Sequence, residues 1–404
     1  MSAPIVIVGA GLAAAKAVEA LRQSGYDGGL VVFGEEPHRP YERPPLSKEY
    51  LTGSAELAGV FVHDADWYTR HDVDLRPGTR VTGLDLSGRQ VSAGTGSQPY
   101  DRLLIATGAS PRHLPMADES GAPVAYLRTI EDSNRIKSEL RPGLRLVVVG
   151  GGWIGLEVAA AARAADAQVT VVESAELPLL AVLGPDVADI FASLHRDYDV
   201  DLRVSTTVTA VQEWDGRAVV HLSDASTVDA DLLVVGIGVV PNVSLAEEAG
   251  LRTGDGILVD EYLRTSDPHV YAAGDVAAVE RPGLARPLRV EHWDNAINQG
   301  IVAGRNLAGD KVAYDRAPYF FTDQYDLGME YVGHVAPGGY DRVIIRGETT
   351  GSRLFTAFWL SGHHVLAGMH ANDWDAIDPI RALVGEDVDP DRLADAAVPL
   401  SELL

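Results

Sequence analysis

Two short apolar runs, residues 5–8 (IVIV) and 146–149 (LVVV), have the same surroundings in this chain. Each is followed by a glycine-rich turn, an alanine-rich stretch and a second apolar run, at 30–33 and 169–172 respectively. A continuous apolar run bounded by turn residues is typical of a buried parallel strand, and an alanine-rich stretch favours a helix. The pattern therefore predicts two β-α-β units of a doubly wound α/β fold.

The order of the other signals indicates that the second unit is inserted into the first. An irregular segment rich in Pro and Arg (37–45) and a strand ending at 103–108 separate the two units. The second unit closes with an apolar strand and a Gly and Pro turn at 232–241, and residues 266–275 then show a turn, a short strand and an acidic helix start. From about Tyr319 onward, apolar residues alternate as in antiparallel strands.

We therefore expect an α/β chain with two Rossmann-type dinucleotide-binding domains and a C-terminal α+β domain that contains an antiparallel sheet. A chain of 404 residues is long enough for each domain to have its own core. The expected domains are residues 1–113 with 245–317 for the discontinuous first one, 114–244 for the inserted one, and 318–404 for the C-terminal one.

Each predicted turn from strand to helix carries a glycine fingerprint. In such a turn the first glycine allows the tight bend, the second lets the backbone approach a pyrophosphate, and the third small residue permits close packing of the helix. The diphosphate would lie at the helix start, where backbone N–H groups are free and the helix dipole favours negative charge. The positions are Gly9, Gly11 and Ala14 in the first unit, and Gly150, Gly152 and Gly155 in the second.

A carboxylate at the end of the second strand supports each fingerprint, which alone would be weak evidence. Glu35 and Glu173 each lie a little over 20 residues beyond the first glycine of their unit. An acid at this position can accept hydrogen bonds from ribose hydroxyl groups. The alternative is a solvated charge at a strand end. Fingerprint and acid together predict two dinucleotide sites.

Composition narrows the class of protein. The chain is 46% hydrophobic and 23% charged, as is typical of globular proteins, and no apolar run approaches the roughly 20 residues of a membrane span. Residues 3–8 are interpreted as the first strand rather than a signal peptide, so we expect a cytoplasmic protein. The formal net charge of −25 argues against nucleic acid or an anionic membrane as partner.

The sequence contains no cysteine. This excludes a disulfide, a thiolate metal site and a redox-active cysteine pair, so electrons cannot pass through a protein disulfide. His363, His364 and His370 lie near one another in the sequence, but no motif supports a metal cluster there and we expect no metal site.

These features, taken in order, resemble the FAD-dependent NADH:ferredoxin reductases of bacterial oxygenase systems. The likeness covers nearly the whole chain, and its most specific parts are 43–48 (RPPLSK) and 322–326 (TDQYD). The resemblance implies a glutathione-reductase-like fold with FAD at the first fingerprint, NADH at the second and a C-terminal interface domain. The other matching segments are shared among two-dinucleotide flavoproteins: 9–14, 106–109, 150–155 with Glu157, 236–241 and 271–275.

Several residues then acquire expected roles toward FAD. Asp275, at the expected helix start, would accept from a ribityl hydroxyl or simply cap the helix. Arg43 would clamp the pyrophosphate with its forked guanidinium, unless it is a generic surface arginine. Trp293, before an expected helix at 296–306, would contact the flavin or serve core packing. The expected FAD-binding positions are Gly9, Gly11, Ala14, Glu35, Arg43, Lys48, Val81, Ala106, Thr107, Gly108, Arg128, Asp275, Val276 and Trp293.

Lys48 and Glu157 are the expected catalytic residues. The resemblance implies that Lys48 lies beside the flavin N5 edge and Glu157 near the nicotinamide, and we infer that they pair. A cation there would stabilise negative charge on reduced flavin, and Glu157 would orient it. The alternative is a purely structural salt bridge. The family usually has tryptophan where this chain has Phe321, so the chain departs from the family pattern at the position of the aromatic shield.

The second fingerprint is expected to bind NADH in preference to NADPH. The carboxylate of Glu173 suits the two free hydroxyls of the NADH ribose and repels a 2'-phosphate, and the neighbouring Ser174 brings no cation. The expected NAD-binding positions are Gly150, Gly152, Trp153, Ile154, Gly155, Glu173, Gly236, Ile237 and Gly238.

The resemblance implies that NADH reduces FAD by hydride transfer, and that single electrons then pass to a small iron-sulfur ferredoxin, expected to be of the two-iron kind, which serves a monooxygenase or dioxygenase. Arginines such as Arg305 or Arg316 would offset repulsion at the docking surface of so acidic a chain, which is expected to be a monomer or homodimer. The alternatives are a rubredoxin reductase, an NADH oxidase, or a redox-sensing flavoprotein similar to apoptosis-inducing factor.

Overall fold

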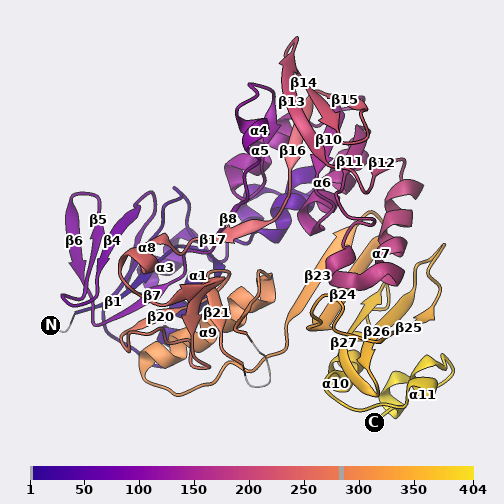
Figure 1. Ribbon diagram of the computed structural model, residues 1–404. Coiled ribbons are helices and arrows are strands. Elements are labelled where there is room, and N and C mark those ends of the chain that lie inside the picture. The colour runs from indigo at the N-terminus through magenta and orange to yellow at the C-terminus, as the bar shows by residue number, and fades with distance from the viewer. Residues whose placement is uncertain (1–2, 282–285) are drawn as a thin grey trace. The chain divides into compact units, whose positions relative to one another are not determined.

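The computed structural model describes residues 3–281 and 286–404. The chain forms two compact units, which are coloured by residue number in Figure 1. Unit 1 comprises Met1–Arg43, Leu57–Ser110 and Val239–Pro318; unit 2 comprises Pro44–Glu56, Pro111–Gly238 and Tyr319–Leu404. The division into three domains expected from the sequence is a finer one, and it stays a prediction.

Unit 1 is built on a parallel sheet with the strand order β20-β7-β1-β2-β3. Every residue of β1 and β2 is buried, because continuous apolar runs can be covered on both faces of a parallel sheet. The strands are β1 (Ile5–Val8), β2 (Leu30–Phe33), β3 (Val73–Arg76), β7 (Arg102–Ile105) and β20 (Val270–Ala272).

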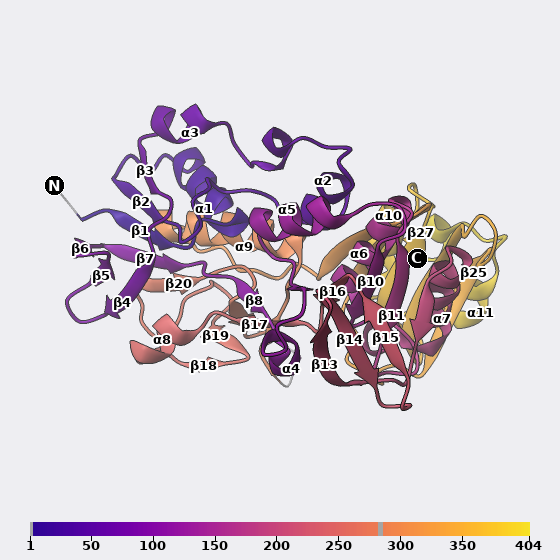
Figure 2. The same ribbon diagram turned by 90° about the horizontal axis from the view of Figure 1, so that it is seen from above.

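Helices α1 (Leu12–Gln23) and α9 (Trp293–Ala308) pack against each other and lie side by side in both Figure 1 and Figure 2. Two glycines of α9, Gly300 and Gly304, make this approach possible. A Cβ atom added to either would collide with a backbone carbonyl oxygen of α1, that of Ala13 or Ala17 respectively. The two helix backbones therefore approach more closely than side chains would allow.

The rest of unit 1 consists of small sheets and short helices. An antiparallel sheet has the order β4-β5-β6, and a mixed one has the order β18-β19-β21-β22. The elements are η2 (Leu57–Val60), α3 (Ala65–Arg70), β4 (Val81–Asp85), β5 (Gln90–Ala93), β6 (Gly96–Pro99), β8 (Ala109–Pro111), β17 (Val239–Pro241), α8 (Ser244–Glu248), β18 (Thr253–Gly254), β19 (Gly256–Val259), β21 (Ala277–Val279) and β22 (Leu288–Arg289).

The expected helix start at Asp275 is wrong. Asp275 lies in a turn between β20 and β21, and β21 pairs in parallel with β19, with residues 257–259 opposite residues 277–279. The three residues of β21 are buried, so their pairing with a neighbouring strand prevails over the local helix signal of an acid after glycine. The expected helix at 296–306 is present and belongs to α9.

Unit 2 contains the second β-α-β unit, in a parallel sheet with the order β12-β11-β10-β16-β9. An antiparallel sheet, β13-β14-β15, accompanies it. The elements are η1 (Pro44–Ser47), α2 (Glu49–Thr52), α4 (Pro115–Asp118), β9 (Val124–Ala125), α5 (Ile130–Glu139), β10 (Arg145–Val149), α6 (Trp153–Ala164), β11 (Gln168–Val172), α7 (Leu180–Asp197), β12 (Asp201–Arg203), β13 (Val208–Trp214), β14 (Arg217–Leu222), β15 (Thr227–Ala230) and β16 (Leu232–Val235).

The C-terminal part of unit 2 is an antiparallel sheet with the order β23-β24-β27-β26-β25, as the alternating pattern predicts. Trp359 of this sheet is fully buried, and its indole N–H donates to the carbonyl oxygen of Leu183 on α7 at 3.0 Å. The elements are β23 (Tyr319–Gln324), β24 (Leu327–Gly333), β25 (Arg342–Gly347), β26 (Phe355–Ser361), β27 (His364–Ala371), α10 (Ile377–Leu383), α11 (Pro390–Ala394) and η3 (Leu400–Glu402).

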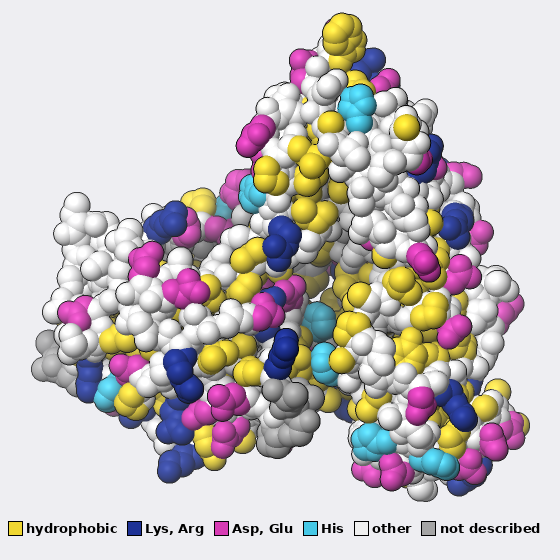
Figure 3. Space-filling view, in the orientation of Figure 1, with side chains coloured by type: hydrophobic (Ala, Val, Ile, Leu, Met, Phe, Trp, Pro, Cys, Tyr) yellow, Lys and Arg dark blue, Asp and Glu magenta, His cyan; other side chains and the backbone are white. Residues whose placement is uncertain are grey.

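Charged side chains of both signs are interspersed on the face shown in Figure 3. Within the part of the chain that the structure describes, no helix combines the length and apolar character needed to cross a membrane.

The contact between α1 and α9 predicts the effect of Gly304→Ala. The added methyl group would push against the backbone of α1, so the free energy of unfolding should fall by about 1–3 kcal/mol, as in other overpacked interiors. Urea denaturation followed by circular dichroism measures the change. Gly59→Ala is the matched control, since no described atom lies within 4 Å of its added Cβ. Equal stability of the two variants would contradict this packing.

Candidate functional site

The first fingerprint forms a tight turn between β1 and α1. Gly9 has a φ of +107°, and a Cβ there would collide with the backbone at Ala106, just beyond β7. At Gly11, by contrast, an added Cβ would meet no described atom within 4 Å. Gly9 is thus required by the fold, whereas Gly11 leaves space in front of the backbone, as a pyrophosphate needs.

The second fingerprint repeats this geometry between β10 and α6. Gly150 has a φ of +103°, and a Cβ there would collide with the carbonyl oxygen of Gly236. A Cβ at Gly152 would again meet no described atom within 4 Å. Gly155 lies in the first turn of α6, where a Cβ would collide with the carbonyl oxygen of Gly150. Gly150 and Gly155 therefore have no room for a side chain, whereas Gly152 leaves space in front of the turn.

Both helix starts are open to an anion. Gly11 and Gly152 are the N-caps of α1 and α6, and a glycine has no side chain with which to cap its own helix. The first turns of α1 and α6, both within the described residues, contain no acidic residue. The free N–H groups and the positive end of the helix dipole can therefore serve a phosphate. Ala14 is buried, consistent with close helix packing.

The residues after the second fingerprint differ in their surroundings. The ring of Trp153 lies 5.7 Å from that of Phe191 and 4.8 Å from that of Phe320, so it serves packing in unit 2. Ile154 is 45% exposed at the start of α6. Of the expected turn 236–238, the N–H of Gly236 donates to Val149 O at 2.8 Å. Ile237 is partly buried between Gly236 and Gly238, and Gly238 has a φ of +96°.

Glu173 is held over its own glycine turn. One carboxylate oxygen accepts from the N–H of Gly151 at 2.6 Å, and the other accepts from the N–H of Ala175 at 2.7 Å. Oε1 also accepts from the hydroxyl group of Ser174 at 3.1 Å, so Oε2 is the oxygen with a further lone pair for a ribose hydroxyl group. Glu35 in unit 1 is instead exposed and pairs with Arg80 at 3.1 Å. Only Glu173 of these two acids is therefore oriented by its fingerprint.

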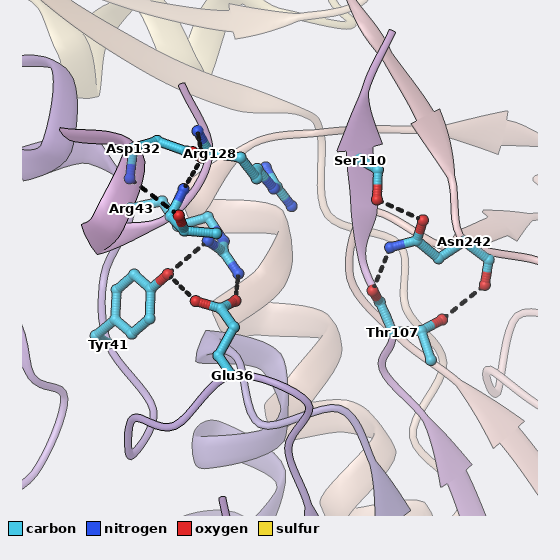
Figure 4. A network of polar contacts seen from close by, with 9 residues as sticks. Glu36, Tyr41, Arg43, Thr107, Ser110, Arg128, Asp132 and Asn242 are labelled. Atoms are coloured by element: carbon cyan, nitrogen blue, oxygen red, sulfur yellow. Dashed lines mark hydrogen bonds and ion pairs between the residues drawn. The ribbon is translucent and has the colours of Figure 1, made fainter. Parts of the chain in front are cut away.

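Arg43 takes part in a hydrogen-bonded triad, which Figure 4 shows. Its guanidinium donates to Glu36 at 2.8 Å and to the hydroxyl of Tyr41 at 2.8 Å, and that hydroxyl donates to the other oxygen of Glu36 at 2.5 Å. Burial raises the pKa of Tyr41, so the hydroxyl keeps its proton. The sequence analysis missed Glu36, although it directly follows Glu35 at the strand end.

Asn242 fixes the loop that follows β7, also seen in Figure 4. Its side-chain amide donates to the carbonyl oxygen of Thr107 at 2.8 Å, and the Thr107 hydroxyl donates to the Asn242 carbonyl at 2.9 Å. Ser110 donates to the Asn242 amide oxygen at 2.8 Å. Gly108 has a φ of +67°, which suits the turn. Asn242 was also missed; Pro241 before it signals a turn but no partner.

Other expected FAD positions have varied environments. Val276 and Val81 are buried in the core of unit 1, and the N–H of Gly274 donates to Gln299 at 2.8 Å, which fixes the turn that carries Asp275. Trp293 is the first residue of α9.

His292, the N-cap of α9, lies just before Trp293, in the segment 291–295 that the family resemblance places at the flavin. Burial lowers the pKa of His292 to about 4, against the opposing charge of Asp275, so its imidazole is neutral at pH 7.

Arg128 belongs to unit 2, where its backbone N–H donates to the carboxylate of Asp132 at 3.0 Å. That carboxylate also closes the capping box of α5 with Thr129.

Lys48 and Glu157 form the expected ion pair within unit 2, with Nζ 2.7 Å from Oε1. Their side chains are only 11% and 4% exposed. Glu157 also accepts from the hydroxyl groups of Ser47 at 2.5 Å and Thr322 at 2.6 Å. The charge of this buried pair is thus supported by neutral donors, as a buried carboxylate requires.

The surroundings of Lys48 include two further side chains of β23. Its Nζ lies 5.2 Å from the centre of the ring of Phe321, the position where the family usually has tryptophan. Burial raises the pKa of Asp323, which the charge of Lys48 partly offsets. Residues 322–326 are one of the two segments most specific to the family resemblance. They thus reach the Lys48–Glu157 pair through Thr322 and Asp323.

Two of the three histidines considered as metal ligands pair with acidic side chains. His370 pairs with Glu330 at 2.7 Å, and His364 pairs with Asp387 at 3.0 Å. Over residues 3–281 and 286–404, no three His, Asp or Glu side chains are grouped so as to hold a metal ion.

Comparison with known proteins now identifies the class of this fold. Residues 3–300 match the family described as pyridine nucleotide-disulphide oxidoreductase, and residues 319–404 match the reductase C-terminal family. The chain belongs to the pyridine nucleotide-disulphide oxidoreductase family. Its fold class is therefore as predicted, with two dinucleotide-type units and an antiparallel C-terminal sheet.

Individual members of the family resemble the chain over its whole length. It is 38% identical to putidaredoxin reductase of Pseudomonas putida, over 99% of this chain and 96% of that protein. It is 39% identical to the ferredoxin–NAD(+) reductase component of the anthranilate 1,2-dioxygenase system of Burkholderia cepacia, over 99% of both chains. The covalent putidaredoxin reductase–putidaredoxin complex superimposes with a TM-score of 0.94, at 37% identity, covering 99% of this chain and 97% of that one. The resemblance drawn from the sequence is confirmed.

The two kinds of glycine in the second fingerprint predict separable effects. Gly152→Ala should leave the free energy of unfolding nearly unchanged while weakening NADH binding at least about tenfold, or about 1.4 kcal/mol, because the methyl group fills the space in front of the turn. Gly150→Ala should lower the free energy of unfolding by more than about 1 kcal/mol, because of its positive φ and the collision with Gly236.

Thermal unfolding and an NADH titration of the oxidised protein measure the two effects. The assignment of the second fingerprint fails if Gly152→Ala binds NADH as well as the wild type.

Proposed function

We propose that the protein is an NADH-dependent ferredoxin reductase, which takes electrons from NADH through FAD and delivers them singly to an iron-sulfur ferredoxin of an oxygenase system. The observation that carries this proposal is the full-length identity to ferredoxin–NAD(+) reductases, in a chain with two open fingerprint turns and no cysteine. The family name refers to disulfides, but a chain without thiols cannot pass electrons to one. The electrons would therefore leave bound FAD directly, without passing through a disulfide of this chain.

The fingerprint turns fit the two cofactors. FAD would lie against Gly11 at the start of α1, with Arg43 toward its pyrophosphate and Glu35 toward its ribose. Asp275 and Val276, on their turn after β20, would complete the unit 1 side. When bound, FAD accepts a hydride from NADH and can release its electrons one at a time.

Some expected residues have a less direct part. Lys48 and Arg128, also expected to bind FAD, belong to unit 2, and their contact with it stays a prediction. Glu36 holds Arg43 at 2.8 Å, so the guanidinium has a fixed position before any phosphate arrives.

NADH would bind at the second fingerprint, with its pyrophosphate at Gly152 and its adenosine ribose at Glu173. The two backbone hydrogen bonds of Glu173 hold the carboxylate in place, so that a ribose with free hydroxyls meets acceptors. A 2'-phosphate would meet a fixed negative charge. This supports NADH over NADPH as the electron donor.

The acceptor is proposed to be a small two-iron ferredoxin, and the enzyme to be a cytoplasmic monomer or homodimer. Arg305 and Arg316 were expected to help docking, yet both are paired. Arg305 lies 3.0 Å from Asp310, and Arg316 makes two hydrogen bonds to Asp294 at 2.9 and 3.0 Å. Their charges are largely offset, so they carry no argument for the position of the docking surface.

A steady-state assay tests the function directly. The purified FAD-loaded protein is mixed with NADH or NADPH and a panel of two-iron and four-iron ferredoxins, a rubredoxin, or oxygen alone. We expect a ferredoxin to accelerate NADH oxidation at least about tenfold over oxygen, with NADH preferred to NADPH by a larger kcat/KM.

The other outcomes of this assay identify the alternatives. Acceleration by rubredoxin alone would make the protein a rubredoxin reductase, and fast turnover with oxygen alone would make it an NADH oxidase. Slow turnover with every acceptor and a long-lived complex with NADH would indicate a redox-sensing flavoprotein.

The proposed role of Lys48 predicts a kinetic defect in Lys48→Ala. Loss of a buried positive charge should slow reduction of bound FAD by NADH by about 100-fold, the size expected for one preorganised electrostatic group. Stopped-flow absorbance at saturating NADH measures this rate. Lys137→Ala is the control, because Lys137 also binds the segment around α2 through Tyr50 O at 2.9 Å but does not contact Glu157. An unchanged rate in Lys48→Ala with FAD still bound would leave the pair a structural salt bridge.

A further inference from the structure

A row of hydrogen-bonded side chains continues from Glu157 into the interior of unit 2. The Thr322 hydroxyl is 2.6 Å from Glu157 Oε1, and Gln324 Nε2 is 3.2 Å from the same hydroxyl. Gln324 Oε1 is 2.8 Å from His195 Nε2, and His195 Nδ1 is 3.1 Å from the hydroxyl of Tyr325. We call these four residues, Thr322, Gln324, His195 and Tyr325, the donor chain.

The donors and acceptors in this row have one consistent direction. Glu157, paired with Lys48, has only acceptor oxygens, so the hydroxyl of Thr322 must donate to it and accept from the amide of Gln324. The amide oxygen of Gln324 then accepts from His195 Nε2–H, which leaves Nδ1 to accept from Tyr325. Every hydrogen bond in the donor chain therefore points toward Glu157, and bonds aligned in this way strengthen one another.

The row lies in the interior of the unit, where an unmet polar group is costly. Thr322 and His195 are fully buried, and Gln324 is 1% exposed. Burial lowers the pKa of His195 to about 4, with the hydrogen bond to Gln324 opposing, so the ring is neutral at pH 7. A neutral imidazole has one donor and one acceptor nitrogen, as the row requires, whereas a charged one has two donors.

The backbone at the outer end of the row is unusual. Tyr325 has a φ of +57°, in the tight turn between β23 and β24, a conformation that a tyrosine adopts at an energetic cost. Its ring stacks on Tyr198 at 3.9 Å, and its hydroxyl reaches His195. Contacts with two side chains therefore hold this residue in a position that its backbone disfavours.

The row joins three elements of unit 2. Glu157 lies on α6, His195 on α7, and Thr322 and Gln324 on β23. Because side chains two positions apart share a face of a strand, Thr322 and Gln324 point in the same direction. The carboxylate that holds Lys48 is thus itself held from the interior of the unit.

We propose that Thr322, Gln324 and His195 are positioning residues, which fix the orientation of the Glu157 carboxylate and, through it, of the Lys48 ammonium group. Without the Thr322 hydroxyl, one oxygen of Glu157 loses a donor, and the carboxylate can rotate between Ser47 and Lys48. The consequence for electron transfer from NADH rests on the proposed function; the consequence for Lys48 itself does not.

Lys48 can be observed on its own because the chain contains only four lysines: Lys16, Lys48, Lys137 and Lys311. In the FAD-loaded protein labelled with ¹⁵N-lysine, the Lys48 ammonium signal is assigned by its loss in Lys48→Arg. We expect Thr322→Val, which keeps shape but removes the hydroxyl, to shift and broaden this signal. Thr322→Ser should restore it, because serine keeps the donor.

Stopped-flow reduction by NADH gives a second readout on the same proteins. Thr322→Val should lower the limiting rate of FAD reduction about tenfold and leave the half-saturating NADH concentration within about twofold, since the donor chain does not touch NADH. Thr356→Val, a buried threonine on β26 outside the donor chain, is the matched control and should change neither readout.

A second variant, Gln324→Met, tests the same proposal if Thr322→Val does not fold. Gln324→Met is close in shape, removes the donor to Thr322 and should also shift the Lys48 signal. An unchanged Lys48 signal in a folded Thr322→Val or Gln324→Met protein overturns the proposal. If the signal shifts while no ferredoxin accepts electrons from the wild type, the positioning role stands and the proposed function fails.

Discussion

The approach of two backbones beneath each glycine turn is the constraint on which the rest of this protein depends. Gly9 lies against the end of β7 at Ala106, and Gly150 against Gly236 at the end of β16, with no room for a side chain. Because of these contacts, α1 and α6 begin directly above the sheet edge. Their free N–H groups then point to a place where a phosphate can bind, which is the basis of both proposed cofactor sites.

A second constraint is chemical. Without cysteine, the chain must move electrons with bound cofactors and oriented charges alone. The buried Lys48–Glu157 pair is such an oriented charge, held by Ser47 and Thr322. A buried ion pair contributes little to stability by itself, so the presence of this hydrogen-bonded pair favours a functional reason.

Local patterns predicted the features that depend on local backbone demands. The two β-α-β units follow from apolar runs, glycine turns and alanine-rich stretches that lie close together in the sequence. Asp275 was placed wrongly because pairing of β21 with a distant strand decided the outcome. The roles of Asn242 and His195 could not be predicted, since each depends on hydrogen-bond partners far away along the chain.

Glu173 also limits how this protein could change its nucleotide. Its two oxygens accept from the N–H groups of Gly151 and Ala175, so the side chain is part of the scaffold of the turn as well as a contact for ribose. An arginine in its place would leave both N–H groups without their acceptor. A change of preference toward the phosphorylated nucleotide therefore requires several coordinated substitutions, and a single one carries a cost in the shape of the turn itself.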